Sequence, residues 1–428
     1  MSGDICQSAV DAVLHRRRRY VFSEHGWPRT GHRRVVRPPA SSSTPYTVTT
    51  PVEFSLGVFA RPENLASAFS ELRANGGHAP GEDGLSFHDF SPGELYEALR
   101  EVSRAIRNGN YKPFPTREVR IPKGDGRFRE LRLLRIMDRV VAKALQLALA
   151  PYWGRTLPGI RRGIWDIYIS LEWTIRCHQR FVLGQDDIRD AFPSARIADV
   201  LHYHHQHITQ PELLRLIEAV VRGHEGPAHT VGLDQGTPTS PTDMELLLHH
   251  CLDLRLEAVD PGHPPLHRYV DNLLYQCRDA QESERVRSLL GETLLPHGLT
   301  LKPGDEPVDV RDRSAGRTVL GLIPCWGRNR LQFSVPETGY AKLNIGLLKA
   351  LDQPNPARAS KDVAMGWLRA VGPALSNGSR QVVVSRVREL LLSQGTREAS
   401  QGELAEVASA SWCRWLEKRG RRLGGTTG

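Results

Sequence analysis

The spacing of apolar and polar residues changes several times along this chain, and each change predicts a different kind of element. Residues 117–123 and 128–133 alternate like strands on either side of a Gly-Asp-Gly turn, which predicts a β-hairpin. Strand-like apolar runs recur at 181–188, 266–277 and 317–323. Apolar residues at helical spacing predict helices at 62–75, 94–107, 137–148, 163–178, 197–207, 209–222, 241–258 and 280–296. Because strands and helices mix between residues 110 and 325, we expect an α+β core.

The two ends of the chain differ from this core in pattern. From residue 339 onward only helical spacing is present, with Leu404 and Trp415 on one apolar stripe, which predicts a helical domain. Residues 1–52 are rich in arginine, proline and serine, a composition that resists packing. We expect a largely disordered basic leader there, with a short helix at 5–14.

Net charge adds a candidate partner to this picture. The formal charge is +9, and the excess of basic residues lies at the two ends. Residues 1–40 hold eight arginines, and the cations near the C-terminus are Arg414, Lys418, Arg419, Arg421 and Arg422. Basic ends on a nearly neutral middle favour binding to nucleic acid, although solvated tails would have the same composition.

Cysteine spacing and hydropathy indicate which cellular compartment to expect. The six cysteines are scattered, without a Cys-x-x-Cys pair or a cluster with histidine. This spacing argues against a disulfide framework and a structural zinc site, and it fits a reducing compartment. The sequence has no apolar run of about eighteen residues and no apolar segment followed by a cleavage site at its N-terminus. We therefore expect a cytoplasmic protein without a membrane partner.

Two aspartates far apart in the sequence are the strongest candidates for chemistry. Asp187 ends an apolar strand, and Asp271 lies at the tip of the hairpin predicted at 266–277. Rigid carboxylates that meet from two strands are what a two-metal phosphoryl-transfer site requires. Two simpler interpretations remain open: Asp186, Asp187 and Asp190 could be acids at a helix entry, and Asp271 could be an ordinary turn residue.

The order of several motifs gives these aspartates a context. Residues 187–194 resemble the first catalytic motif of reverse transcriptases, and 233–241 resemble their Gln-Gly-x-Pro-x-Ser-Pro motif. Residues 268–272, Arg-Tyr-Val-Asp-Asn, are similar to the Tyr-x-Asp-Asp hairpin of that family. The loop at 75–84 is similar to an extra fingers loop of the bacterial group II intron-like lineage. The resemblance covers residues 60–330, and each motif alone would be weak evidence.

The resemblance implies a right-hand polymerase fold and a nucleotidyltransferase activity. The expected parts are fingers at 60–180, a palm at 181–325, a helical thumb at 335–420 and a basic tail at 421–428. The implied enzyme is an RNA-directed DNA polymerase that uses two Mg²⁺ ions, with Mn²⁺ as an alternative, to add deoxynucleotides to a primer 3′ end. Its implied partners are an RNA template, a DNA or RNA primer and deoxynucleoside triphosphates.

The resemblance also implies a role for individual residues. The implied metal ligands are Asp187, Ile188 through its carbonyl, Asp271 and Asn272, with the two aspartates as the catalytic residues. The implied nucleotide-binding residues are Lys123, Arg129, Asp190, Ala191, Phe192, Gln235 and Gly236. The implied contacts to primer and template come from Tyr269, Leu320 and Gly321.

The chain departs from the family pattern at two positions, which keeps other functions open. Asn272 stands where the family has a second hairpin aspartate. In the segment where relatives carry a lysine thought to act as a general acid, residues 302–306 read Lys-Pro-Gly-Asp-Glu, so Lys302 would have to act from a shifted position. One alternative is a catalytically silent RNA-binding protein on the same fold, and another is a maturase-like splicing cofactor. For relatives that stand alone, the resemblance implies a dedicated non-coding RNA and a role in bacterial anti-phage defence. A polymerase that requires a partner protein is a further alternative.

Overall fold

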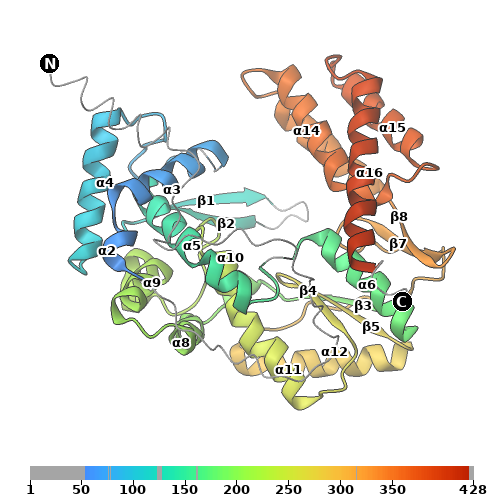
Figure 1. The fold of residues 1–428 in the computed structure, drawn as a ribbon, viewed down its shortest axis with the longest axis horizontal. Helices are drawn as coiled ribbons and strands as arrows, with labels where there is room; N and C mark the ends of the chain where they lie inside the picture. The colour runs from blue at the N-terminus through green and yellow to red at the C-terminus, as the bar shows by residue number, and fades with distance from the viewer. Residues whose placement is uncertain are drawn as a thin grey trace, which may run out of the picture. The chain divides into compact units, whose positions relative to one another are not determined.

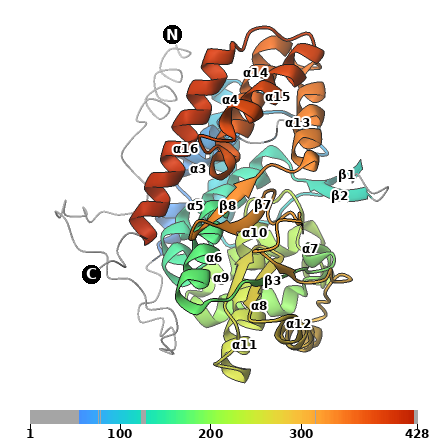
Figure 2. The same ribbon diagram turned by 90° about the vertical axis from the view of Figure 1, so that its right-hand side faces the viewer.

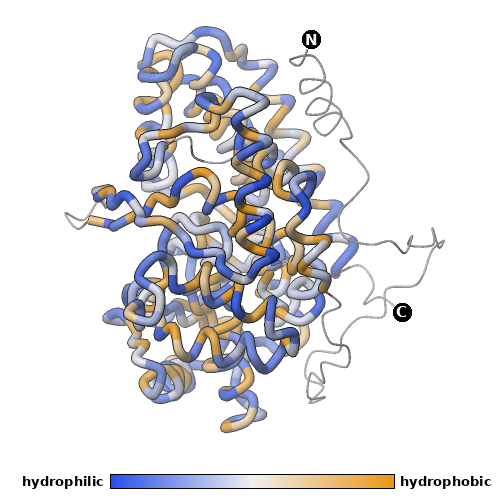
Figure 3. The backbone as a smooth tube through the Cα atoms, turned by 90° about the vertical axis from the view of Figure 1, so that its left-hand side faces the viewer, coloured by the Kyte–Doolittle hydropathy of each residue, from blue (hydrophilic) through white to orange (hydrophobic). Residues whose placement is uncertain are grey.

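The computed structural model describes residues 54–75, 77, 79–122, 128–160, 162–314 and 316–423, which fall into two compact units. Unit 1 contains Met1–Arg161, Ile188–Gly262 and Leu290–Thr300, and unit 2 contains Arg162–Asp187, His263–Leu289 and Leu301–Gly428. The predicted leader at 1–52 and its helix lie outside the described residues. Apolar and polar positions alternate along the helices of both units (Figure 3).

Unit 1 is mainly helical. Its elements are the helices α2 (Leu56–Phe59), α3 (Pro62–Asn75), α4 (Pro92–Arg107) and α5 (Ile136–Thr156), the hairpin of β1 (Arg117–Pro122) and β2 (Phe128–Leu133), and then α7 (Ala191–Ser194), α8 (Ile197–His207), α9 (Pro211–Arg222), α10 (Ser240–Leu248) and α11 (Leu254–Val259). A capping box of Ser91 and Glu94 begins α4, which explains why the helix starts there. Fully buried Val140, Val141 and Met244 lie in the core of this unit. The predicted hairpin and helices are therefore present.

Unit 2 contains a four-stranded antiparallel sheet in the order β4-β5-β3-β6. Three of its strands, β3, β4 and β5, are labelled in Figure 1. The strands are β3 (Val182–Asp187), β4 (Leu266–Tyr269), β5 (Asn272–Cys277) and β6 (Val308–Asp309). Helix α6 (Ile164–His178) packs on one face, where its Leu171 shares a buried cluster with Leu183 and Leu274. Helix α12 (Ala280–Leu294) begins on the other face, since its Arg287 reaches Asp186. The two strands predicted within 266–277 are β4 and β5.

The rest of unit 2 is a hairpin followed by helices. Strands β7 (Ile323–Gly327) and β8 (Arg330–Ser334) are joined by Arg328 and Asn329, both at positive φ (54° and 55°), as a type I′ turn requires. The helices are α13 (Glu337–Ala350), α14 (Pro356–Ala370), α15 (Arg380–Ser393) and α16 (Gln401–Leu423), shown in Figure 2. Their buried residues belong to one cluster with those of α6 and β3. The helical pattern after residue 339 is confirmed, and the limits of a thumb domain stay a prediction.

Two predicted elements differ in the structure. The strand predicted at 317–323 is wrong, because Leu320 and Gly321 both have positive φ (46° and 99°) and form a tight turn closed by Val319 and Leu322. A strand cannot continue through two such residues, so pairing begins only at Ile323. The helix predicted at 241–258 is interrupted by a π-helical turn at His249–Asp253. Among the described residues no helix is long and apolar enough to cross a membrane.

A buried histidine pair in unit 1 makes stability depend on pH. The Nε2 atoms of His207 and His250 lie 2.7 Å apart, so one ring donates its N–H to the other, and protonation of both rings would leave two donors facing each other. Burial lowers the pKa of each ring from 6.5 to about 4. The unfolded chain therefore binds protons that the folded chain excludes, and stability present above pH 6.5 is lost as pH falls toward 4.

We expect His207→Gln to reduce the loss of stability at acid pH. The substitution removes the titrating ring at position 207, so the urea midpoint of unfolding should vary less between pH 7.5 and pH 4.5, read by circular dichroism, than in the wild-type protein. His205, also on α8, is exposed and makes a matched control. An equally steep loss of stability at acid pH in His207→Gln and His205→Gln would contradict the assignment of this pH dependence to the histidine pair.

Candidate active site

The predicted catalytic residues of unit 2 meet at one end of the sheet. In the antiparallel pairing of β3 with β5, Asp187 lies directly opposite Asn272. Residues paired in this way point to the same face, with Cβ atoms about 5 Å apart. Asp271 immediately precedes Asn272, and Tyr269 pairs with Asn272 to close the β4–β5 hairpin. Asp187 and Asn272, far apart in the chain, are thus neighbours because of the strand register.

The tip of this hairpin is a strained two-residue turn. Val270, its first residue, has a φ of 55°. A β-branched residue rarely adopts positive φ, and such strain is characteristic of functional sites. Positive φ at only the first turn residue is typical of a type II′ turn, which usually has glycine there. The neighbouring strands therefore hold Val270, and with it Asp271, in a defined conformation.

The two carboxylate oxygens of Asp187 have different surroundings. Oδ2 accepts a hydrogen bond from the Lys302 ammonium, with Nζ at 2.8 Å. Oδ1 is buried and has no hydrogen-bond partner. A buried oxygen without a partner is costly, and a hard cation would satisfy it. Asp187 therefore offers an oxygen atom that a metal ion would satisfy.

The donor set at this end of the sheet consists of oxygen atoms. Asp187 and Asp271 offer carboxylates, Asn272 an amide oxygen, and Ile188, next to Asp187 in the chain, a backbone carbonyl. Oxygen donors of this kind suit Mg²⁺ or Mn²⁺ better than Zn²⁺. Among the described residues no group of three or more His, Cys, Asp or Glu could hold a metal ion. A metal here would thus rest on two carboxylates with neutral oxygens and water.

The neighbouring Asp186 has a structural role that the sequence did not reveal. Its side chain is buried on the opposite face, where the Tyr275 hydroxyl donates to Oδ2 at 2.6 Å and Arg287 Nε donates to Oδ1 at 3.1 Å. Burial, followed by the bond to Asp186, raises the pKa of Tyr275 well above its usual range. Because Asp186 already accepts hydrogen bonds from Tyr275 of β5 and Arg287 of α12, its role is to link β3 to these two elements.

In unit 1, backbone bonds join two of the predicted motifs. The Phe192 carbonyl accepts from Leu233 N–H at 2.8 Å, which brings α7 beside the loop that carries Gln235. Gln235 Oε1 is buried without a partner, and Gly236 is exposed with a φ of 116°. A Cβ on Gly236 would lie 3.5 Å from the Arg132 carbonyl of β2. Phe192, Gln235 and Gly236 are thus brought together near the β1–β2 hairpin.

An ion-pair network between β2 and this loop was missed in the sequence. Arg132 Nη1 lies 3.1 Å from Glu225 and 3.4 Å from Asp234. Burial raises the pKa of Asp234, and the positive charge of Arg132 partly offsets this effect. One weak signal was present in the sequence, since Asp234 directly precedes Gln235 in the motif. These pairs fix the hairpin to the loop within unit 1.

The remaining predicted residues are placed as follows. Lys123 lies outside the described residues, and Arg129 is an exposed residue of β2 opposite Ile121. Asp190 occupies the N-cap position of α7 at a φ of 41° without a side-chain capping bond, and Ala191 is buried behind it. Asp190 therefore lies at a helix entry without capping it through its side chain.

Leu320 and Gly321 form the turn that replaces the predicted strand. The buried Tyr168 of α6 donates its hydroxyl to the carbonyls of Val319 and Leu320, each at 3.0 Å. Burial raises the pKa of Tyr168 well above its usual range, so the hydroxyl remains a donor. This turn is therefore held rigidly within unit 2.

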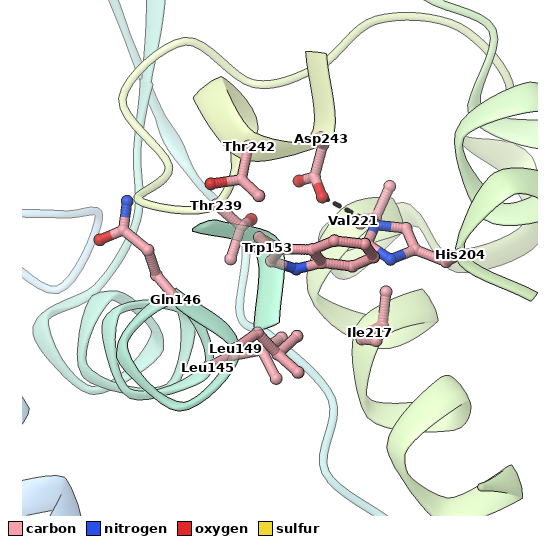
Figure 4. Close-up of a pocket in the computed structure, with 10 residues that line it drawn as sticks. All are labelled: Leu145, Gln146, Leu149, Trp153, His204, Ile217, Val221, Thr239, Thr242 and Asp243. Carbon is pink, nitrogen blue, oxygen red and sulfur yellow. Dashed lines mark hydrogen bonds and ion pairs between the residues drawn. The ribbon is translucent and has the colours of Figure 1, made fainter. Parts of the chain in front are cut away.

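A small pocket in unit 1 is not a candidate for catalysis (Figure 4). It lies among α5, α8, α9 and α10, and its lining includes Leu145, Trp153 and Ile217. His204 Nε2 and Asp243 Oδ1 form a buried pair 2.9 Å apart at its edge, drawn as a dashed line. None of the predicted site residues lines this pocket. Its residues pack the helices of unit 1 together.

Comparisons with known proteins point to the same broad family as the motifs. Residues 121–304 match the family model for reverse transcriptase (RNA-dependent DNA polymerase). Protein YkfC of Escherichia coli (strain K12) is 34% identical over 99 residues, which are 23% of this chain and 26% of YkfC. The chain thus spans about a quarter of the length of this curated relative. The segment that matches the family model includes Asp187, Asp271 and Lys302. We conclude that residues 121–304 of this chain hold a reverse transcriptase domain.

Proposed function

We propose that this protein is an RNA-directed DNA polymerase that adds deoxynucleotides to a primer 3′ end with two divalent metal ions. The observation that carries the proposal is the position of Asp187, opposite Asn272 and beside Asp271, with one buried carboxylate oxygen lacking a partner. The match to the reverse transcriptase family over 121–304 supports the same reaction. In this proposal 60–180 are the fingers, 181–325 the palm and 335–420 the thumb.

Each part of the reaction is assigned to residues of this chain. Asp187 and Asp271, with the Ile188 carbonyl and the Asn272 amide oxygen, would hold the ions. Two ions bound there would supply activation of the primer hydroxyl and neutralisation of the leaving pyrophosphate. The triphosphate-binding cations are Lys123 and Arg129. The nucleotide is further contacted by Asp190, Ala191, Phe192, Gln235 and Gly236, and the primer end by Tyr269, Leu320 and Gly321.

Phe192 and Gly236 have distinct roles in this assignment. The Phe192 ring stacks under the sugar and excludes a 2′-hydroxyl, which selects deoxynucleotides. Gly236 is exposed, has a positive φ and carries no side chain, so it lets the backbone approach the new base pair closely.

The template in this proposal is a dedicated structured RNA. The proposed lineage is group II intron-like, with a role in anti-phage defence.

A catalytically silent RNA-binding or maturase-like protein is the second candidate. Asn272 removes one negative charge from the hairpin, and the Lys302 ammonium lies on Asp187. Both features reduce the attraction of the site for divalent ions. In this alternative, the protein binds RNA and incorporates no nucleotide.

Primer extension by the purified full chain tests the proposal. Extension of a DNA or RNA primer on an RNA template, with deoxynucleotides and either Mg²⁺ or Mn²⁺, is the expected result. Sequencing of nucleic acid that co-purifies with the protein identifies the template and primer to use. Tight binding to that RNA without any extension in either ion would favour the silent protein instead.

A further inference from the structure

Lys302 is fixed to the catalytic strand by both its backbone and its side chain. Its N–H donates to the Asp187 carbonyl at 2.9 Å, and its ammonium donates to Asp187 Oδ2 at 2.8 Å. The Lys302 carbonyl accepts from Arg287 Nη2 at 2.9 Å. Three bonds at one residue distinguish this pair from a chance ion pair at the surface.

The groups around Lys302 are themselves held in place. Arg287 also donates to the buried Asp186, which in turn accepts from Tyr275. Two residues after Lys302, an added Cβ on Gly304 would clash with the Arg287 guanidinium. A side chain at 304 would require the Arg287 guanidinium to move, and the Lys302 ammonium is positioned by its bond to Asp187.

The charge of the site follows from this arrangement. Across from Asp187 the hairpin carries the neutral Asn272, so the negative charge comes from Asp187 and Asp271. The Lys302 ammonium cancels one of these charges. A divalent ion that binds Asp187 must therefore compete with a cation that belongs to the protein.

We propose that Lys302 is a resident counter-cation of Asp187, which weakens divalent-ion binding and leaves Oδ2 when an ion binds. The inference rests on the proposed metal site and adds a residue that sets its affinity. Without a metal ion, the ammonium compensates a half-buried carboxylate and keeps the end of β3 in place. When an ion binds, the ammonium is displaced from the carboxylate and becomes more accessible.

Mn²⁺ binding to the full chain, measured by electron paramagnetic resonance without nucleotide or primer, tests the inference. We expect Lys302→Met to bind Mn²⁺ about tenfold tighter than the wild-type protein, a coupling of the size common between ligands of one site. Lys361→Met is the matched control, because Lys361 forms an equally close pair with Glu403, at 2.6 Å in α14 and α16. Thermal unfolding of each variant shows that it is folded.

Lysine acylation followed by mass spectrometry gives a second readout. We expect Lys302 to react faster when Mg²⁺ or Mn²⁺ is present, whereas Lys361 reacts at the same rate with and without the ion. Equal Mn²⁺ affinity in the wild-type protein and Lys302→Met, with weaker binding in Asp187→Asn, overturns this inference alone. Equal Mn²⁺ affinity in all variants, Asp187→Asn included, overturns the proposed metal site as well.

Discussion

Asp187→Asn is expected to abolish deoxynucleotide incorporation, with a loss of at least about 1,000-fold in the single-turnover rate. The substitution keeps the shape of the side chain but removes the charge that a divalent ion needs, and metal ions contribute several kcal/mol of transition-state stabilisation. Because the opposite residue is already the neutral Asn272, little carboxylate charge remains to compensate. Primer extension at saturating Mg²⁺, repeated with Mn²⁺, measures the loss.

Asp309→Asn provides the control for this experiment. Asp309 belongs to the same sheet, where it lies in β6 and pairs with Val182 of β3, and its carboxylate is bound to Arg311. Its loss should leave incorporation nearly unchanged. Asn272→Asp, which restores a charge beside Asp271, should leave or raise the rate. Full activity in Asp187→Asn would contradict the metal assignment and favour another site for the reaction.

The part of this site that could be predicted from the sequence is local. Alternation of apolar residues predicted β3, β4 and β5, and the hairpin placed Asp271 at a tip between two strands. Each of these signals depends on a few consecutive residues, whose spacing is fixed by strand geometry. The resemblance to a known family then supplied the pairing that spacing alone left open.

The contacts that were not predicted join residues far apart in the chain. Lys302 reaches Asp187 across 115 positions, and no local pattern identifies that pair. The turn at Leu320 was mistaken for a strand because leucine gives no signal of positive φ. The basic residues near the C-terminus were interpreted by composition alone, and the structure gives three of them partners in α6.

These three cations neutralise buried acids within unit 2. Lys418 and Arg422 pair with Asp166, at 2.7 Å and 2.9 Å, and Arg419 pairs with Glu172. Asp166 and Glu172 lie in α6, which contacts α16 (Figure 2). Their partners lie about 250 positions away along the chain, so only the fold reveals that this charge is already compensated.

Arg419→Ala is therefore expected to lower the free energy of unfolding by about 3 kcal/mol. Glu172 is fully buried, and Arg419 binds it with two bonds, Nε to Oε2 at 2.7 Å and Nη2 to Oε1 at 2.5 Å. Removing Arg419 leaves a buried carboxylate with Arg176 as its remaining cation, at 2.8 Å. Urea unfolding followed by circular dichroism measures the change.

Arg421→Ala is the matched control two residues further along α16. Arg421 pairs with Glu417 at 3.2 Å, but both side chains are exposed, so its loss should cost less than about 0.5 kcal/mol. Both substitutions remove one positive charge from the same helix, and they differ only in whether the partner is buried. Equal destabilisation by the two would mean that net charge, and not the buried pair with Glu172, stabilises α16 on α6.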